Sequence, residues 1–252
     1  MKQETQKETP ECSFFDFDAI LRDTFSQNKI AAPTKAESEK FYHLTNHLIT
    51  VNRTTNLTAI RTIPGIVAKH YADSLLLLPY LPQNARILDL GCGAGFPSIP
   101  LAIMRSDLRF IALDSTDKKV RFVQECADLL SLSNLITCSG RAEDAKIRTE
   151  LGNFDFVVSR AVARLNILAE LSLPYLKIDG ALLAMKGAKA EEEAKEALHA
   201  SSVLGGAAPA LFPHTLFAGE EAEARAILKV QKKKATPGIY PRAYAAILKN
   251  PL

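Results

Sequence analysis

The sequence predicts a doubly wound α/β sheet with a helical extension before it, and two patterns lead to that prediction. From Arg86 onward, short apolar runs alternate with segments of helical periodicity, as in parallel strands joined by helices. The first run, 86–90, leads directly into a turn with glycine at positions 91, 93 and 95. Glycine lets a ligand lie against the backbone, so we expect a binding site at the carboxyl end of this strand.

The expected elements follow in chain order. Strands are predicted at 86–90, 110–113, 135–138, 154–158 and 181–185. Helices are predicted at 97–104, 118–130 and 164–175, with an acidic, solvent-facing helix at 190–200. Two more apolar runs, 210–217 and 226–230, joined by an acidic loop at 219–223, can close the sheet as an antiparallel hairpin. The fold class is therefore a seven-stranded, Rossmann-like α/β sheet.

The chain before the sheet is expected to be helical. One apolar stripe spans 14–28, and a second helix begins at Thr34, where Thr34 and Glu37 form a capping box, and continues to about Asn52. A polar connection at 52–60 precedes a third helix, 64–78. We divide the chain into a disordered leader (1–13), a helical extension (14–84), a ligand-binding domain (85–230) and a basic tail (231–252) that lies over the surface.

Bulk properties indicate an ordinary globular protein. The 252 residues are 47% hydrophobic and 23% charged, and the net charge of +3 is too small to prove a polyanionic partner. The polar start predicts no secretory signal, and no apolar run approaches the roughly 18 residues of a membrane span. The four cysteines are scattered without a Cys-x-x-Cys pair, which argues against a zinc site and a disulfide framework. We expect a cytoplasmic, metal-free monomer with no membrane contact.

The glycine turn indicates which cofactor binds. The dinucleotide pattern Gly-x-Gly-x-x-Gly fails because Phe96 stands at its last position, and a Walker loop is absent. The observed Asp-x-Gly-x-Gly-x-Gly, from Asp89, resembles the first motif of methyltransferases that use S-adenosylmethionine (SAM). Asp114 ends the next predicted strand about 20 residues later, where an acid can reach ribose hydroxyls. The alternative is a glycine turn that binds nothing.

Further short motifs, each different, lie along the chain. They lie at 56–60, 70–75, 88–97, 99–103, 113–115, 141–143, 159–163, 186–187, 240–242 and 249–252. With them the chain resembles the RsmG (GidB) family, bacterial SAM-dependent methyltransferases of guanine N7 in 16S ribosomal RNA. The resemblance implies 16S rRNA or the 30S subunit as partner. Cys92 and Ser98 depart from the usual family residues, and the family's Gly-x-Pro after Arg242 is missing.

The resemblance also implies site residues. Cofactor contacts are expected at Gly91, Phe96, Ala142, Glu143 and Arg160, with Asp114 and Ser115 close by. The glycine turn itself adds Asp89, Cys92, Gly93 and Gly95. Two roles stay open: Arg160 can instead pair with a carboxylate such as Glu143, and Asp89 can contact the methionine amine or merely cap the turn.

Basic residues are candidates for RNA contacts, although each can equally be a solvated charge. The candidates are Arg53, Lys69, His70, Arg164, Lys186, Lys232, Lys233, Lys234 and Arg242. His70, on an otherwise apolar helix, can equally be a core histidine with satisfied hydrogen bonds.

The implied chemistry needs no general base, because guanine N7 has a lone pair and no proton. The sequence agrees: the polar Asn/Asp-Pro-Pro-aromatic loop of amine methylation does not follow strand 154–158. We therefore expect catalysis by alignment and assign no catalytic residue. The alternatives are a small-molecule or other-atom methyltransferase and a non-catalytic SAM- or RNA-binding module. Cys138, a conceivable nucleophile for cytosine methylation, is expected inside the sheet.

Overall fold

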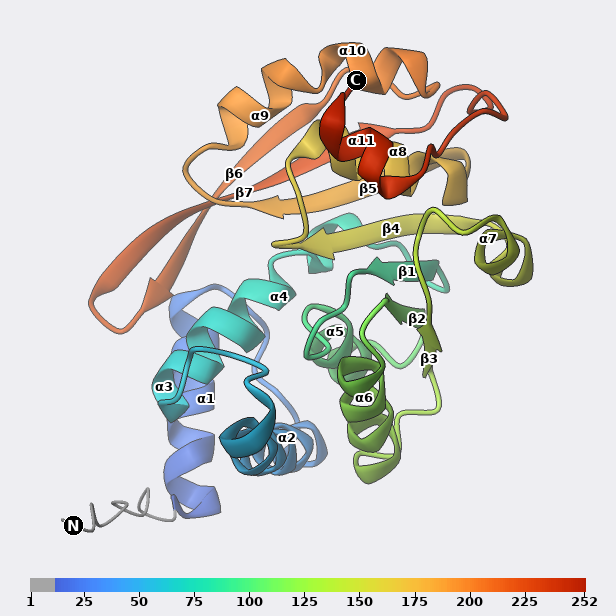
Figure 1. Cartoon of the computed structure of the whole chain (residues 1–252). Coiled ribbons are helices and arrows are strands. Elements are labelled where there is room, and N and C mark those ends of the chain that lie inside the picture. The colour runs from blue at the N-terminus through green and yellow to red at the C-terminus, as the bar shows by residue number, and fades with distance from the viewer. Residues whose placement is uncertain (1–11) are drawn as a thin grey trace, which may run out of the picture.

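A single mixed sheet of seven strands runs through the protein in the computed structural model, which describes residues 12–252 (Figure 1). The strands are β1 (Arg86–Leu90), β2 (Arg109–Asp114), β3 (Leu135–Ser139), β4 (Phe154–Arg160), β5 (Leu176–Lys186), β6 (Ala210–Ala218) and β7 (Glu221–Gln231). Their order is β3-β2-β1-β4-β5-β7-β6; β7 is antiparallel to β5 and to β6, whereas the other pairs are parallel. The predicted seven-stranded α/β fold is confirmed.

Helices cover both faces of the sheet. They are α5 (Ser98–Met104), α6 (Asp117–Leu129), α7 (Ala145–Leu151), α8 (Leu165–Ser172), α9 (Ala190–Glu196) and α10 (Leu198–Val203). Alternate residues of a strand point to opposite faces, so Ile87 joins one buried cluster with α5 and α6, while Leu88 joins another with α8. Among the described residues, no helix combines the length and apolar character that a membrane crossing requires.

The N-terminal extension packs against the first of these clusters. It consists of α1 (Phe14–Gln27), α2 (Lys35–Thr55) and a helical segment made of α3 (Ile63–Ile66), a π-helix (Val67–Ala72) and α4 (Asp73–Leu75). The capping box at Thr34 is present, and Phe41 of α2 packs on Tyr71 with ring centroids 4.9 Å apart. The third predicted helix ends at Leu75, earlier than expected. It contains a π-helical segment, a feature often found at functional sites.

Three other expectations need correction. Of the predicted disordered leader, residues 1–11 lie outside the described part, but Ser13 is ordered and caps α1 by accepting from Asp16 N (3.2 Å). The acidic loop 219–223 is a two-residue turn, because Ala218 pairs with Glu221 and the acids from Glu221 onward belong to β7. The tail does not merely lie over the surface: it forms α11 (Tyr244–Lys249), whose Ile247 is fully buried.

Candidate functional site

The glycine turn after β1 is held against the end of β2. Gly91, Gly93 and Gly95 all have positive φ angles (74°, 56° and 83°), which side chains with a Cβ rarely adopt. The amides of Gly91 and Cys92 both donate to Leu113 O, at 2.8 and 3.0 Å. A Cβ on Gly91 would lie 2.4 Å from Val162 Cγ2, whereas a Cβ on Gly93 would meet nothing within 4 Å. Gly93 therefore leaves its backbone open to a ligand.

Asp114 completes this turn from the end of β2. Its Oδ2 accepts from Gly93 N (3.0 Å) and its Oδ1 accepts from Thr116 N (2.9 Å). Each carboxylate oxygen has a second lone pair, so Asp114 can still accept from a pair of ligand hydroxyls. The acid and the glycine turn thus form one unit, as the spacing predicted.

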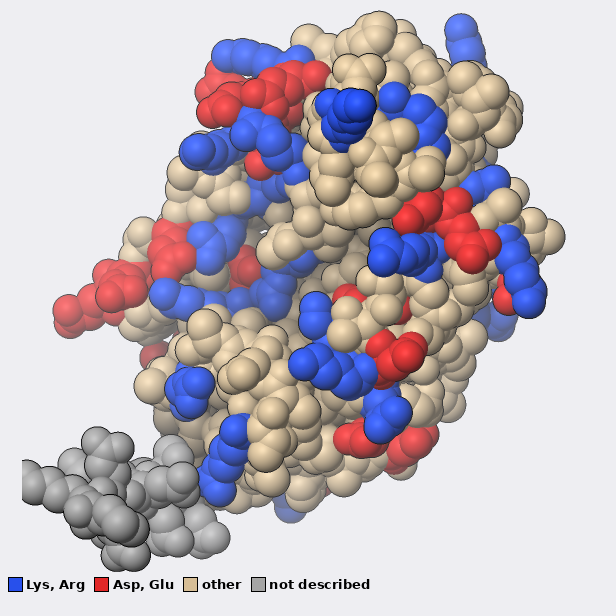
Figure 2. All heavy atoms as spheres, in the orientation of Figure 1, with Lys and Arg blue, Asp and Glu red and all other residues tan. Residues whose placement is uncertain are grey.

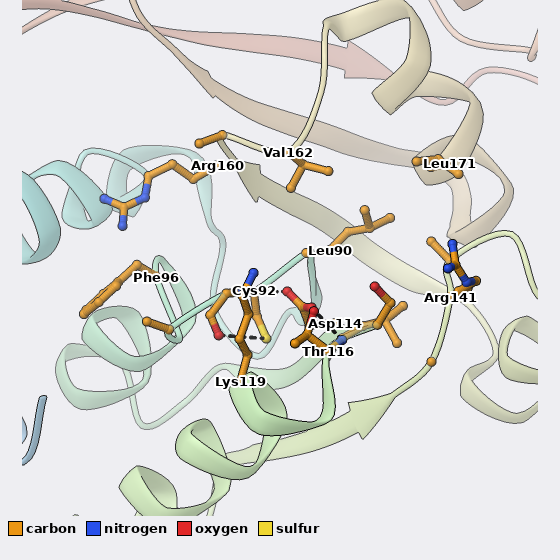
Figure 3. A pocket seen from close by; sticks show the side chains of 18 of the residues that line it. Leu90, Cys92, Phe96, Asp114, Thr116, Lys119, Arg141, Arg160, Val162 and Leu171 are labelled. Atoms are coloured by element: carbon orange, nitrogen blue, oxygen red, sulfur yellow. Dashed lines mark hydrogen bonds between the residues drawn. The ribbon is translucent and has the colours of Figure 1, made fainter. Parts of the chain in front are cut away.

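These groups open into a cavity of about 460 Å³ at the carboxyl edge of the sheet (Figure 3). This volume lies within the range of small-molecule and cofactor sites. Phe96 and Arg160 lie at one end of the cavity and Arg141 and Leu171 at the other, with Asp114 between them (Figure 3). The cavity therefore has the size and the position expected of a cofactor site in a doubly wound fold.

All the predicted cofactor residues line this cavity except Asp89 and Gly95. Asp89 is fully buried, and its Oδ2 accepts from Ser98 N (3.1 Å) at the start of α5. Of the two roles considered for Asp89, this contact matches the structural one. Burial raises the pKa of this carboxyl group to about 6.

Sequence reasoning missed several lining residues. They include Thr58, Lys119, Arg141, Val162 and Tyr244. Thr58, Arg141 and Val162 lie inside motifs quoted from the sequence, and those motifs could have indicated them. Tyr244 comes from the tail, and only tertiary folding brings it to the cavity.

Arg160, the last residue of β4, organises one end of the cavity. It does not pair with Glu143; its Nη1 donates to Lys69 O (2.8 Å) and to Asp73 Oδ2 (3.1 Å), and its Nη2 donates to His70 Nδ1 (3.1 Å). Since arginine only donates, His70 Nδ1 accepts, and the ring's proton lies on Nε2, 2.8 Å from Thr58 Oγ1. The ring stacks on Phe96 with centroids 4.4 Å apart.

His70 is therefore a neutral part of the wall. Burial, with the neighbouring Arg160 charge second, lowers its pKa to about 3. Both ring nitrogens are engaged, so the interpretation as a satisfied histidine fits better than an RNA contact.

A second cavity of about 620 Å³ adjoins the first. The two share His70, Arg160, Ala161 and Val162 as lining residues. Most of the charges around the second cavity are positive. The basic residues are Lys69, Arg160, Arg164, Lys186 and Arg225, against the acids Asp73 and Glu193. Basic side chains gather along the hollow of this face, with the acidic tip of the β6–β7 hairpin at its edge (Figure 2).

Comparison with known proteins identifies the family. The family model described as GidB, rRNA small subunit methyltransferase G, matches residues 37–214. The chain belongs to this family. It is 39% identical to the ribosomal RNA small subunit methyltransferase G of Leuconostoc citreum over 87% of this chain and 92% of that protein. The corresponding protein of Deinococcus radiodurans is 42% identical over 85% of each chain.

Solved structures support the fold. An O-methyltransferase from Bacillus cereus, in complex with SAH, superposes with a TM-score of 0.54 at 16% identity, covering 86% of this chain and all of that one. A methyltransferase from Pyrococcus furiosus gives a TM-score of 0.52 at 13% identity, covering 78% of this chain and all of that one. This chain therefore shares the α/β fold of these two methyltransferases.

The residues predicted to contact RNA lie in different parts of the protein, and four of them line the second cavity. Lys69, His70, Arg164 and Lys186 line the second cavity. Lys69 pairs with Glu223 (2.6 Å), Arg164 with Glu192 (2.8 Å) and Glu196 (2.6 Å), and Lys186 with Glu193 (2.7 Å). Arg53 is exposed near the end of α2.

The tail lysines lie at the other edge of the sheet. Because β7 is antiparallel to β5, its end lies beside the start of β5, where Lys233 is 3.6 Å from Asp179; Lys234 is exposed beside it. The prediction that Lys232 contacts RNA is wrong. Lys232 is 2% exposed, and its Nζ donates to Leu173 O (2.7 Å) and to Thr236. Arg242 is engaged with buried Glu170 (2.6 Å).

Proposed function

We propose that the chain transfers the methyl group of SAM to N7 of a guanine in 16S ribosomal RNA of the small subunit. The observation that carries the proposal is the shared wall of two cavities at the carboxyl edge of the sheet. The names of the relatives, ribosomal RNA small subunit methyltransferase G, support rRNA as the substrate. The basic side chains that line the second cavity are candidates for contacts to the phosphates of a nucleotide.

The first cavity fits SAM. The open backbone at Gly93 and the free acceptor capacity of Asp114 suit the adenosine and its ribose hydroxyls. Bound there, SAM would supply a sulfonium methyl group. We assign the contacts to the cavity-lining residues of the glycine turn, to Asp114 and Ser115, to Ala142 and Glu143, and to Arg160.

The chain's residues position the base for this reaction. Guanine N7 uses its own lone pair to bond the methyl carbon, while the carbon–sulfur bond breaks and its electrons leave on sulfur, so no proton has to move. The neutral His70 stacks on the Phe96 ring in the shared wall, and Arg160 anchors this wall through its contacts with the π-helix and α4. Alignment of this kind can supply several kcal/mol of the barrier reduction. We further propose a monomer that works in the cytoplasm, where bacterial ribosomal RNA resides.

The direct test is methyl transfer from labelled SAM to 16S rRNA and to 30S subunits that lack N7 methylation, followed by mapping of the modified base. We expect one 7-methylguanine. Gly91→Val should abolish the product, because its Cβ would clash with Val162 and its φ is positive. Gly238→Ala is the matched control, since its Cβ meets nothing within 4 Å.

Two outcomes contradict the proposal in different ways. A methyl group on another base atom would keep the enzyme class and change the chemistry. SAM binding without transfer to either RNA substrate would instead favour a small-molecule enzyme or a regulatory SAM-binding module.

A further inference from the structure

The orientation of the target base follows from the two cavities, if the proposed function holds. N7 lies on the Hoogsteen edge of guanine, which meets the Watson–Crick edge at O6, and the N1–H and N2 amino groups point away from N7. If N7 faces the shared wall at Arg160 and Val162, the N1–H and N2 groups point away from that wall, into the part of the second cavity that the first cavity does not share. That part is lined by Lys186, Gly187 and Glu193, none of which lines the first cavity.

Guanine's Watson–Crick edge presents two adjacent donors, N1–H and the N2 amino group, and an ionised carboxylate only accepts hydrogen bonds. Two carboxylates line the second cavity. Both oxygens of Asp73 are held by arginines, because its Oδ1 accepts from Arg225 (3.0 Å) and its Oδ2 accepts from Arg160 (3.1 Å) of the shared wall. This leaves Glu193.

Glu193 is held with one oxygen free. Its Oε2 accepts from Leu165 N at the start of α8 (2.9 Å) and pairs with Lys186 Nζ (2.7 Å) at the end of β5. Its Oε1 has no hydrogen-bond partner within residues 12–252. The Glu193 and Lys186 side chains are only 14% and 9% exposed. Two fixed elements therefore hold this carboxylate, which pairs with the Lys186 ammonium.

We propose that Glu193 recognises the target guanine: Oε1 accepts from N1–H and the N2 amino group while N7 faces the methyl group. Adenine presents a bare acceptor at N1, which a carboxylate repels. Glu193 and Lys186 thus set the base specificity of the reaction and take no part in the methyl transfer itself. RNA-binding proteins commonly read unstacked bases on this edge.

The test uses 30S subunits reconstituted with 16S rRNA that carries a single inosine at the methylated position. Inosine keeps N7 and N1–H and lacks only the N2 amino group. We expect the wild-type kcat/KM to fall roughly 10- to 100-fold on inosine, as for one lost hydrogen bond to a charged group. In Glu193→Gln the guanosine rate should fall by about the same factor, and its preference for guanosine over inosine should drop below about 3-fold.

Glu192→Gln is the matched control, because Glu192 is the neighbouring acid and pairs with Arg164 on the surface. It should keep the wild-type preference. The thermal unfolding temperature and the SAM affinity of each variant separate a folding defect from lost recognition. A purely structural role for Glu193 would lower both rates and leave their ratio unchanged, and that result overturns the inference.

The wild-type protein alone also tests it, since equal rates on guanosine and inosine would exclude recognition of the N2 group whatever the variants do. If the wild-type protein formed no 7-methylguanine at all, the proposed function would fail first.

Discussion

One buried carboxylate beneath the glycine turn gives a prediction at the scale of a single residue. Asp89 Oδ1 is buried and has no partner within residues 12–252, and burial raises the Asp89 pKa from 3.8 to about 6. Between these two values the native state holds a proton that the unfolded state has lost. The contribution of Asp89 to the unfolding free energy therefore falls as pH rises from about 4 to 6 and does not recover above that window.

Asp89→Asn should remove this cost. The amide oxygen can still accept from Ser98 N, so we expect the variant to be more stable by roughly 1–3 kcal/mol at pH 7. Urea denaturation at a series of pH values measures this, and the stability difference between the variant and the wild type should grow from about pH 4 to about pH 6. The same variant resolves the role of Asp89: a loss of SAM affinity above about 10-fold would show that it binds the methionine amine instead.

At the scale of elements, one acid joins three parts of the fold. Asp73 begins α4, and its carboxylate accepts from Arg160 of β4 and from Arg225 of β7. Asp73 is 5% exposed, so Asp73→Asn would leave two arginines facing a neutral amide. We expect a loss of about 3 kcal/mol in unfolding free energy and a larger fall in kcat than in SAM affinity, because Arg160 loses its position.

The control for this prediction is Glu191→Gln. Glu191 pairs with Lys195 on the surface, where both side chains are more than 70% exposed. Such an exposed pair contributes little to stability, because solvent screens it. Equal losses in the two variants would contradict a special role for the Asp73 contacts.

The same contacts explain which parts of the site were predictable. The glycine turn and Asp114 could be predicted, because each lies at the end of a strand that the local sequence indicates. Parallel strands bring those ends together. The partners of Arg160 could not be predicted, because Asp73 and His70 lie about 90 residues away in the sequence and contact it only in the folded protein. The acidity of Glu221 to Glu223 suggested a loop, but a two-residue turn at Gly219 with a positive φ places these acids in β7.

At the scale of the whole molecule, strand and helix alternation predicted the sheet but not the tail. Period and apolar content locate elements that bury a face, and the seven strands follow from them. The charges of the tail predicted a segment exposed to solvent. Lys232 is instead buried against backbone carbonyls, and Ile247 is in the core. Whether a charged residue is buried depends on the partner that satisfies it, and here that partner lies elsewhere in the chain, where the local sequence does not show it.

The tail should therefore contribute to both stability and the site. Glu170 of α8 is fully buried, and its carboxylate accepts from Arg242 N (2.9 Å), Nε (2.8 Å) and Nη2 (2.6 Å). Arg242→Met leaves that carboxylate without its cation, which costs about 3–5 kcal/mol. Because Tyr244, two residues later, lines the cofactor cavity, SAM affinity should fall as well.

Urea denaturation and SAM titration measure the two effects. Glu170→Gln combined with Arg242→Met should recover part of the lost stability, because the buried charge is then gone and only the packing is altered. Lys249→Met is the control: Lys249 is exposed in α11, and its loss should change the unfolding free energy by about 0.5 kcal/mol at most. If Arg242→Met were no more costly than this control, the tail would be a surface appendage as its charge first suggested. A large loss that the double variant relieves would instead make the last residues of the chain part of the folded core and of the cofactor site.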